Sequence, residues 1–141
     1  MKKPIQLIFL FPLLLFSCIN VDLKYKTLDF EVFTLKVPNN WESFSSQGYD
    51  SIVGGITNGK DELAYDYGWY SYDFQNETTE THRRITTSID GKPALIVLPI
   101  KKGEGIIGVY IEVDSQNKFN LFGRDIKNED RIRKIFESVK F

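Results

Sequence analysis

The sequence predicts an α+β fold: a single antiparallel β-sheet of about six to seven strands, with a C-terminal helix packed on it. Three observations lead to this prediction. Apolar residues recur with a period of two from residue 29 onward, and turn-forming residues separate these segments at regular intervals. The period changes to that of a helix only after Asn128.

The first half of this region contains three predicted strands. They cover residues 33–37, 50–57 and 61–72. In the first strand Phe33, Leu35 and Val37 share one face, and Trp41 follows closely enough to cap the edge of the core. Asn58-Gly59 separates the other two strands, and this dipeptide is a strong signal for a tight hairpin. We therefore expect these two strands to pair antiparallel.

The second half contains the remaining predicted strands. They cover residues 84–89, 94–100, 107–113 and 119–122. Asp90-Gly91 predicts a hairpin between the first two of them. The run from Ala94 to Leu98 is apolar at every position, which is typical of a strand buried on both faces. We expect that strand at the centre of the sheet.

One amphipathic helix follows the strands. Asn128 is a favourable N-cap, and Glu129 and Asp130 suit the positive end of the helix dipole. The apolar residues with the spacing of one helix face are Ile132, Ile135, Phe136 and Val139. Residues 137–141 could instead leave the helix and add a last short strand, so the two structures compete there.

Composition narrows the possible functions. The chain has 141 residues, which suits one domain. Its formal net charge of −1 lacks the basic surface that nucleic-acid binding needs, so no nucleic-acid partner is expected. One Cys and one His are too few for a disulfide framework or a zinc site. Neither a metal nor a cofactor is expected.

The N-terminus indicates a targeting segment. Two lysines precede an apolar run from Ile5 to Phe16, which at about 12 residues is too short to span a bilayer. The run ends in Leu15-Phe16-Ser17-Cys18, which resembles the bacterial lipobox. The resemblance implies diacylglyceryl transfer to Cys18, removal of residues 1–17 as a signal peptide, and acylation of the new amine. The alternative is an ordinary secretory signal that leaves Cys18 as a free thiol.

The lipobox interpretation predicts where the chain resides. Two or three acyl chains anchor a protein stably, so the membrane is an expected partner through the lipid. Residue 19 is Ile rather than the Asp of the familiar inner-membrane retention signal, which favours the outer membrane of a bacterial envelope. Residues 18–28 are then a short tether, and residues 29–141 are a single domain.

Four short motifs in residues 29–141 carry a family resemblance. They are Val37-Pro38 with Trp41 close behind, Tyr67-Gly68-Trp69-Tyr70, Ile89-Asp90-Gly91 before a hydrophobic strand, and Ser138-Val139-Lys140-Phe141 after the helix. Together they look like the PsbP-like superfamily, an antiparallel sheet sandwiched by helices. The resemblance implies a helix-poor version of that fold and a role in binding or assembly. It implies no catalytic residue.

The strand predicted at 61–72 and its continuation are rich in aromatic residues. These are Tyr65, Tyr67, Trp69, Tyr70, Tyr72 and Phe74. Alternation puts the first three on one face and directs the others toward the opposite face beyond Gly68. The simpler interpretation is core on one side and a covered or edge surface on the other. The alternative is an exposed platform formed by Tyr65, Tyr67, Trp69 and Tyr70, which would contact a glycan or a protein.

Two other motifs suggest chemistry and have simpler explanations. Residues 54–61 match a phosphate-binding loop until Asp61, which stands where a Ser or Thr must ligate magnesium. Because the flanking segments are predicted strands, this loop is better explained as a hairpin tip. His82 lies in a polar stretch that is typical of a solvated loop, and the sequence shows no nucleophile or orienting acid beside it.

We therefore expect an envelope lipoprotein without enzymatic activity, which acts through contacts with an envelope protein. The alternative is a module that binds a glycan or another small ligand with the aromatic segment 65–74. A hydrolytic enzyme that uses His82 is a third and less favoured class, because such an enzyme needs partner groups that the sequence does not reveal.

Overall fold

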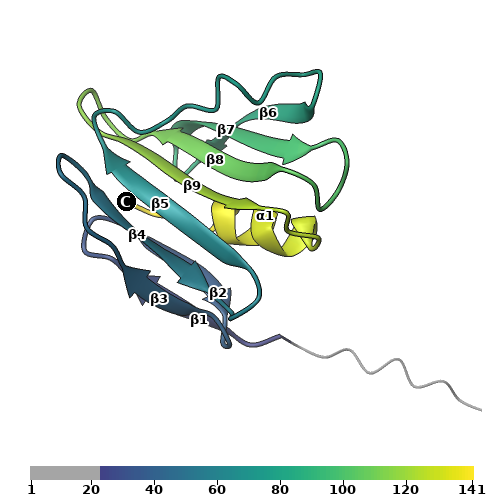
Figure 1. Cartoon of the computed structure of the whole chain (residues 1–141). Helices are drawn as coiled ribbons and strands as arrows, with labels where there is room; N and C mark the ends of the chain where they lie inside the picture. The colour runs from purple at the N-terminus through teal and green to yellow at the C-terminus, as the bar shows by residue number, and fades with distance from the viewer. Residues whose placement is uncertain (1–22) are drawn as a thin grey trace, which may run out of the picture.

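The computed structural model describes residues 23–141 (Figure 1). The predicted signal peptide and Cys18 lie outside the described residues. The elements in chain order are β1 (Tyr25–Asp29), β2 (Thr34–Pro38), β3 (Glu42–Ser45), β4 (Ile52–Thr57), β5 (Glu62–Gly68), β6 (His82–Ile89), β7 (Lys92–Pro99), β8 (Ile106–Glu112), β9 (Lys118–Arg124) and α1 (Glu129–Glu137).

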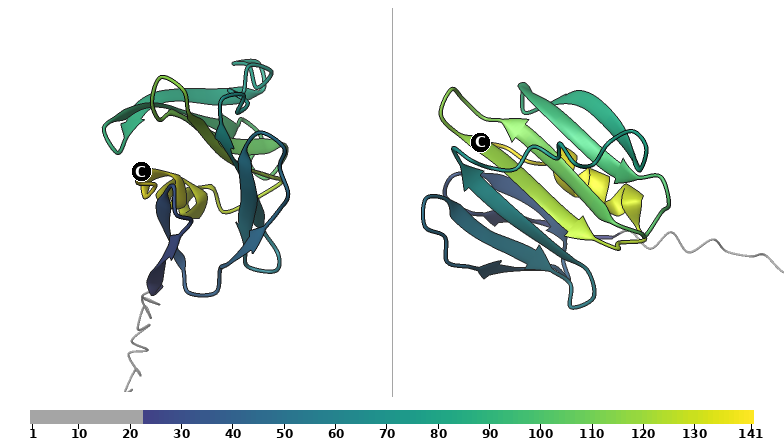
Figure 2. Two further views of the ribbon diagram at one scale, coloured as in Figure 1. Left: turned by 90° about the vertical axis from the view of Figure 1, so that its left-hand side faces the viewer. Right: turned by 45° about the horizontal axis from the view of Figure 1, so that its top comes forward.

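A large antiparallel sheet dominates the fold. Its seven strands follow the order β3-β4-β5-β9-β8-β7-β6, and β1 and β2 form a separate two-stranded hairpin. Figure 2 shows the sheet curving around α1 and the β1-β2 hairpin, which both lie on its concave side. The α+β class is confirmed. The prediction of a single sheet is wrong, because the strand around Leu35 pairs with β1 in a separate hairpin and packs against the large sheet instead of joining it.

The hydrophobic core fills the space between the concave face, the hairpin and the helix. Leu35 and Val37 of β2 are fully buried there, as are the four residues predicted for the apolar helix face. Phe33 lies among other rings, with its centroid 4.7 Å from that of Phe119 and 5.0 Å from that of Tyr65. Trp41, the predicted cap of the core edge, is fully buried.

Both predicted tight hairpins are present. Asn58-Gly59 connects β4 to β5, and the Asn58 side-chain oxygen accepts hydrogen bonds from the backbone of Lys60 and Asp61 at 2.9 and 2.7 Å. Gly59 has a φ of 87°, which glycine adopts without strain. Asp90-Gly91 likewise connects β6 to β7. The turn chemistry of these dipeptides therefore fixed the register of four strands.

The helix begins as predicted. The Asn128 side chain accepts a hydrogen bond from the Arg131 backbone at 3.2 Å, and the helix ends at Glu137. The competition at residues 137–141 resolves into a single bridge, in which the backbones of Lys140 and Thr34 exchange hydrogen bonds of 2.8 and 2.9 Å. This bridge joins the end of the chain to β2.

Several predicted boundaries differ from the structure. Residues 25–28, expected in the tether, belong to β1, where Leu28 faces Leu35 across the hairpin. The strand β5 ends at Gly68 rather than near residue 72, and His82 opens β6 rather than lying in a loop. The strand β7 is next to the edge, and β9 is the central strand of the sheet.

Residues 69–81, which we name the strap, cross the outer, convex face of the sheet from β5 to β6 (Figure 2). Phe74 is fully buried beneath the strap, where its ring occupies the space that a Cβ on Gly108 would need. Arg84 donates hydrogen bonds to the carbonyl oxygens of Phe74 and Glu77 at 2.8 and 2.6 Å. The strap explains why β7 is buried on both faces without being central, since Val97 pairs with Gly108 directly beside the Phe74 ring.

Candidate functional site

Exposed hydrophobic side chains gather at one end of the sheet. Tyr49 and Tyr70 are largely exposed, Trp69 is 50% exposed and Ile52 is 46% exposed. Ile52 begins β4 and faces Tyr67 near the end of β5, while Trp69 and Tyr70 follow β5 directly. We name this region, defined by Tyr49, Ile52, Trp69 and Tyr70, the aromatic end. Large exposed hydrophobic side chains that gather in one region mark interaction sites more often than scattered ones do.

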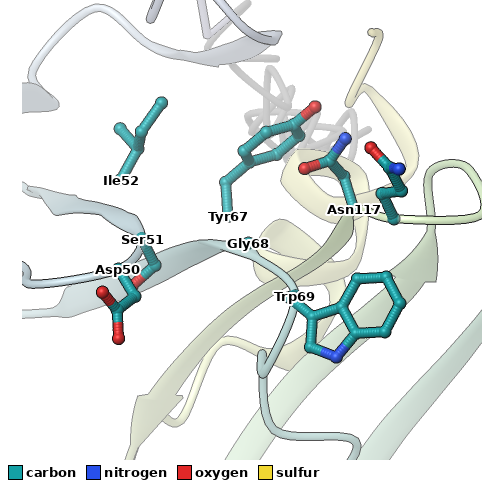
Figure 3. A pocket seen from close by; sticks show the side chains of 8 residues that line it. Asp50, Ser51, Ile52, Tyr67, Gly68, Trp69 and Asn117 are labelled. Atoms are coloured by element: carbon teal, nitrogen blue, oxygen red, sulfur yellow. The ribbon is translucent and has the colours of Figure 1, made fainter.

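An open pocket of about 570 Å³ lies at the aromatic end (Figure 3). Three segments form it: the loop before β4, the end of β5 and the turn between β8 and β9. The lining residues are Asp50, Ser51, Ile52, Tyr67, Gly68, Trp69, Gln116 and Asn117. A Cβ on Gly68 would lie 2.9 Å from that of Ser51, so glycine allows the loop to approach β5. The pocket combines one indole ring with carboxylate, hydroxyl and amide groups.

Trp69 turns away from the face on which it was expected. The strand ends at Gly68, so the alternation that would place Trp69 beside Tyr67 stops there. Figure 3 shows the Trp69 and Tyr67 rings on opposite sides of the chain. The Lys118 ammonium lies 5.0 Å from the centroid of the indole, a cation–π contact. Lys118 reaches it because it pairs with Gly68 across β5 and β9.

The predicted platform of four aromatic residues is reduced to two exposed ones. Tyr65 is buried among Phe30, Phe33 and Phe119, and therefore cannot contribute to an exposed surface. Tyr67 is half-buried and lines the pocket. Burial raises the pKa of both tyrosines, and the charge of Asp114 raises that of Tyr67 further. Trp69 and Tyr70 remain as the outward-facing pair.

A compact turn holds Asn117 at the pocket. Asp114 accepts hydrogen bonds from the backbones of Gln116 and Asn117, both at 2.8 Å, and from the Asn117 side-chain nitrogen at 3.1 and 3.0 Å. These bonds, led by those of the Asn117 side chain, lower the pKa of the Asp114 carboxyl. The sequence predicts a connection between the strands at 107–113 and 119–122, and an Asp three residues before an Asn is a recognisable turn signal within it.

His82 lies far along the strap from Trp69, at the start of β6. One ring nitrogen, Nε2, is 2.8 Å from the Ile106 carbonyl oxygen, and the other, Nδ1, is 2.8 Å from the Thr81 hydroxyl. Because a carbonyl oxygen can only accept a hydrogen bond, Nε2 carries the ring proton and donates a hydrogen bond to the Ile106 carbonyl oxygen. Both ring nitrogens are therefore engaged by neighbours of this chain.

Within residues 23–141, no group of three His, Cys, Asp or Glu side chains is arranged to hold a metal ion. No helix in that part of the chain is long and apolar enough to cross a membrane. Residues 54–61 form the end of β4 and a hairpin tip, as predicted from the mismatch with a phosphate-binding loop.

Comparison with known proteins leaves the site to be interpreted from its own geometry. No protein-family model matches the chain, and a search of curated proteins finds no significant match.

Proposed function

We propose that this chain is a bacterial envelope lipoprotein, anchored through Cys18 in the outer membrane, which binds an envelope protein with its aromatic end and catalyses no reaction. The observation that carries the proposal is the gathering of Trp69, Tyr70, Tyr49 and Ile52 at one end of the sheet. Trp and Tyr are enriched among the few residues that supply most of the binding energy at protein interfaces.

The path of the chain supports this use of the aromatic end. β1 begins at Tyr25, and the neighbouring Lys26 forms an ion pair of 2.6 Å with Glu42. Glu42 pairs with Thr57, the last residue of β4 before the Asn58-Gly59 tip. Trp69 follows the opposite end of β5, roughly 20 Å away along the strand. Tyr25, at the start of the first strand after the proposed anchor, therefore lies toward the end of the sheet opposite to the aromatic end.

The binding role is favoured over catalysis by the surroundings of His82. Its ring nitrogens contact Ile106 and Thr81. To act as a general base, His82 would therefore have to break one of these hydrogen bonds before it could accept a proton from a substrate. We also propose a helix-poor PsbP-like domain. That proposal is supported by the antiparallel sheet with a terminal helix and by the burial of Trp41 behind Pro38.

Site-specific crosslinking in cells tests the proposed contact. A photoreactive phenylalanine derivative replaces Tyr70 in one variant and Tyr25 in a matched control. Both positions hold exposed tyrosines, at opposite ends of the molecule. We expect a discrete protein adduct from position 70 that is lost when Trp69→Ala is added, and no such adduct from position 25. The proposal is wrong if both positions give the same products, or if position 70 gives none.

The anchor is tested separately with Cys18→Ala. We expect this variant to move from the membrane fraction to the soluble fraction while its far-UV circular dichroism stays that of the wild type, because Cys18 precedes all the described strands. A Cys18→Ala protein that still sediments with membranes would contradict lipidation at this residue.

A saccharide is a second candidate ligand, favoured by the pocket in which Trp69 lies beside Asp50, Ser51 and Asn117. Sugars stack on indole rings and form hydrogen bonds with such polar groups. Trp41 is buried, so a ligand at the pocket should change only the fluorescence of Trp69. Titration with soluble envelope polysaccharide should give a saturable change that Trp69→Phe abolishes. A flat response would leave protein binding as the function.

A further inference from the structure

A second pocket, of about 380 Å³, lies on the outer face of the sheet next to the strap. We name it the outer groove and define it by Asp73, Arg84, Pro93, Leu95, Tyr110 and Glu112. Tyr110 and Leu95 face each other across β8 and β7, and both are half-buried. They give the groove a floor that is apolar and, at Tyr110, aromatic.

Two carboxylates stand over this floor. Glu112 follows Tyr110 by two residues in β8 and therefore projects from the same face, while Asp73 comes from the strap. After burial, the charges of Glu112 and then Asp73 raise the pKa of the Tyr110 hydroxyl, so both carboxylates lie within electrostatic reach of it. Neither forms an ion pair with any residue between 23 and 141.

Two cations on this face of the sheet, Arg84 and Lys118, have other partners. Arg84, which lines the groove, donates two hydrogen bonds to strap carbonyl oxygens at 2.8 and 2.6 Å. Lys118 faces Glu112 across β8 and β9, and its ammonium lies at the Trp69 ring. The groove thus has two exposed acceptor groups and one guanidinium held by the backbone of the strap. Its lining carries a formal charge of −1, from Asp73, Glu112 and Arg84.

We propose that the outer groove binds an arginine side chain of the partner protein. A planar guanidinium fits this setting because it can stack on the Tyr110 ring while its N–H groups donate to Asp73 and Glu112. Charge complementarity between the groove and the guanidinium identifies the occupant. This inference rests on the proposed protein-binding function. It adds a second contact site, which lies next to the aromatic end because Lys118 faces Glu112 and contacts Trp69, and it names the residue type of the partner that this site would bind.

The test uses the ¹⁵N-labelled full chain in non-ionic detergent micelles and N-acetyl-arginine amide as the probe. We expect saturable shifts of the amide resonances around Leu95 and Tyr110. The matched probe N-acetyl-citrulline amide has a similar shape and no charge, and should cause no saturable shift. In the double variant Asp73→Asn and Glu112→Gln, the affinity for the arginine probe should fall about tenfold or more, because both charge-assisted acceptors are lost.

A second pair of neutral substitutions controls for net charge. Glu62→Gln and Glu104→Gln remove two exposed carboxylates near the other end of the sheet and should leave the affinity unchanged. Equal losses in both double variants, equal binding of citrulline, or no saturable shift would each overturn the proposal. Tyr49→Ala, which alters the aromatic end but not the contact between Lys118 and Trp69, should retain arginine binding. The groove can therefore be judged even if the crosslink from position 70 fails.

Discussion

Replacing Gly108 with Ala should displace the Phe74 ring from the outer face of the sheet. A Cβ at position 108 would lie 2.5 Å from Phe74 Cζ and 2.8 Å from its Cε1, well inside contact distance. Gly108 has no positive φ, so its backbone conformation suits any residue. The ring of Phe74 is therefore the reason that position 108 must be glycine.

The size of the effect follows from the burial of Phe74. Its side chain is fully buried, and replacing a buried Phe with Ala usually costs about 3–5 kcal/mol. That cost is an upper limit for the effect of Gly108→Ala, because the strap stays attached after the Phe74 ring moves: Arg84 and Asn120 still donate hydrogen bonds to its carbonyl oxygens. We expect Gly108→Ala to lower the free energy of unfolding by about 2–4 kcal/mol.

A double-mutant cycle identifies the cause. Urea denaturation, followed by circular dichroism and by the fluorescence of buried Trp41, gives the free energy of unfolding for each variant. In a Phe74→Ala background the space is open, so Gly108→Ala should be neutral or should stabilise by up to about 1 kcal/mol. If Gly108→Ala costs the same in both backgrounds, Phe74 is not what excludes a side chain at position 108.

Three further outcomes are expected from urea midpoints. Asn128→Ala should lower the free energy of unfolding by about 1 kcal/mol, while Asn128→Asp should keep the N-cap; equal losses would argue against capping. Burial raises the pKa of Tyr65 in the folded state. Its contribution to the free energy of unfolding is therefore complete below the ordinary tyrosine pKa and is lost as pH rises from there to the raised pKa, and Tyr65→Phe should flatten this alkaline decline. Hydrogen bonds from Asn117 lower the pKa of Asp114 in the folded state. Its contribution to the free energy of unfolding is therefore present above the ordinary Asp pKa and is lost as pH falls through the lowered pKa, and Asp114→Asn should lose less stability over that acidic interval.

Local signals predicted the parts of the fold that local chemistry determines. Asn58-Gly59 opens a four-residue turn, Asp90-Gly91 forms a two-residue one, and the Asn128 cap precedes its helix directly. The strand β3 was not predicted because Glu42–Ser45 contains one apolar residue, Phe44, and so shows no alternation. Its partner β4 lies beyond a loop of six residues, and pairing rather than pattern makes it a strand.

The site was harder to predict than the fold because its geometry depends on distant residues. Phe74 is buried only because Gly108 leaves space for it, and nothing within the strap indicates that glycine. Trp69 departs from alternation because β5 ends one residue earlier, where Gly68 meets the loop at Ser51. Glu129 was expected as a helix-start charge, yet it is buried and forms an ion pair with Arg83 of β6. The outer groove combines the strap with β6, β7 and β8 and had no sequence signal.

The bridge between Thr34 and Lys140 affects how quickly the native state forms. It joins residues 106 positions apart, and the central strand β9 pairs with β5 residues that are 50 to 58 positions earlier. Contacts between such distant parts of a chain must overcome a large loss of loop entropy before they stabilise anything, so folding is slow. The β1-β2 hairpin contacts the sheet through Phe33, but its bridge to Lys140 can form only after the last residues of the chain are in place. Until then part of the concave face, which α1 covers in the native state, stays exposed, and such a partly folded chain is prone to aggregate.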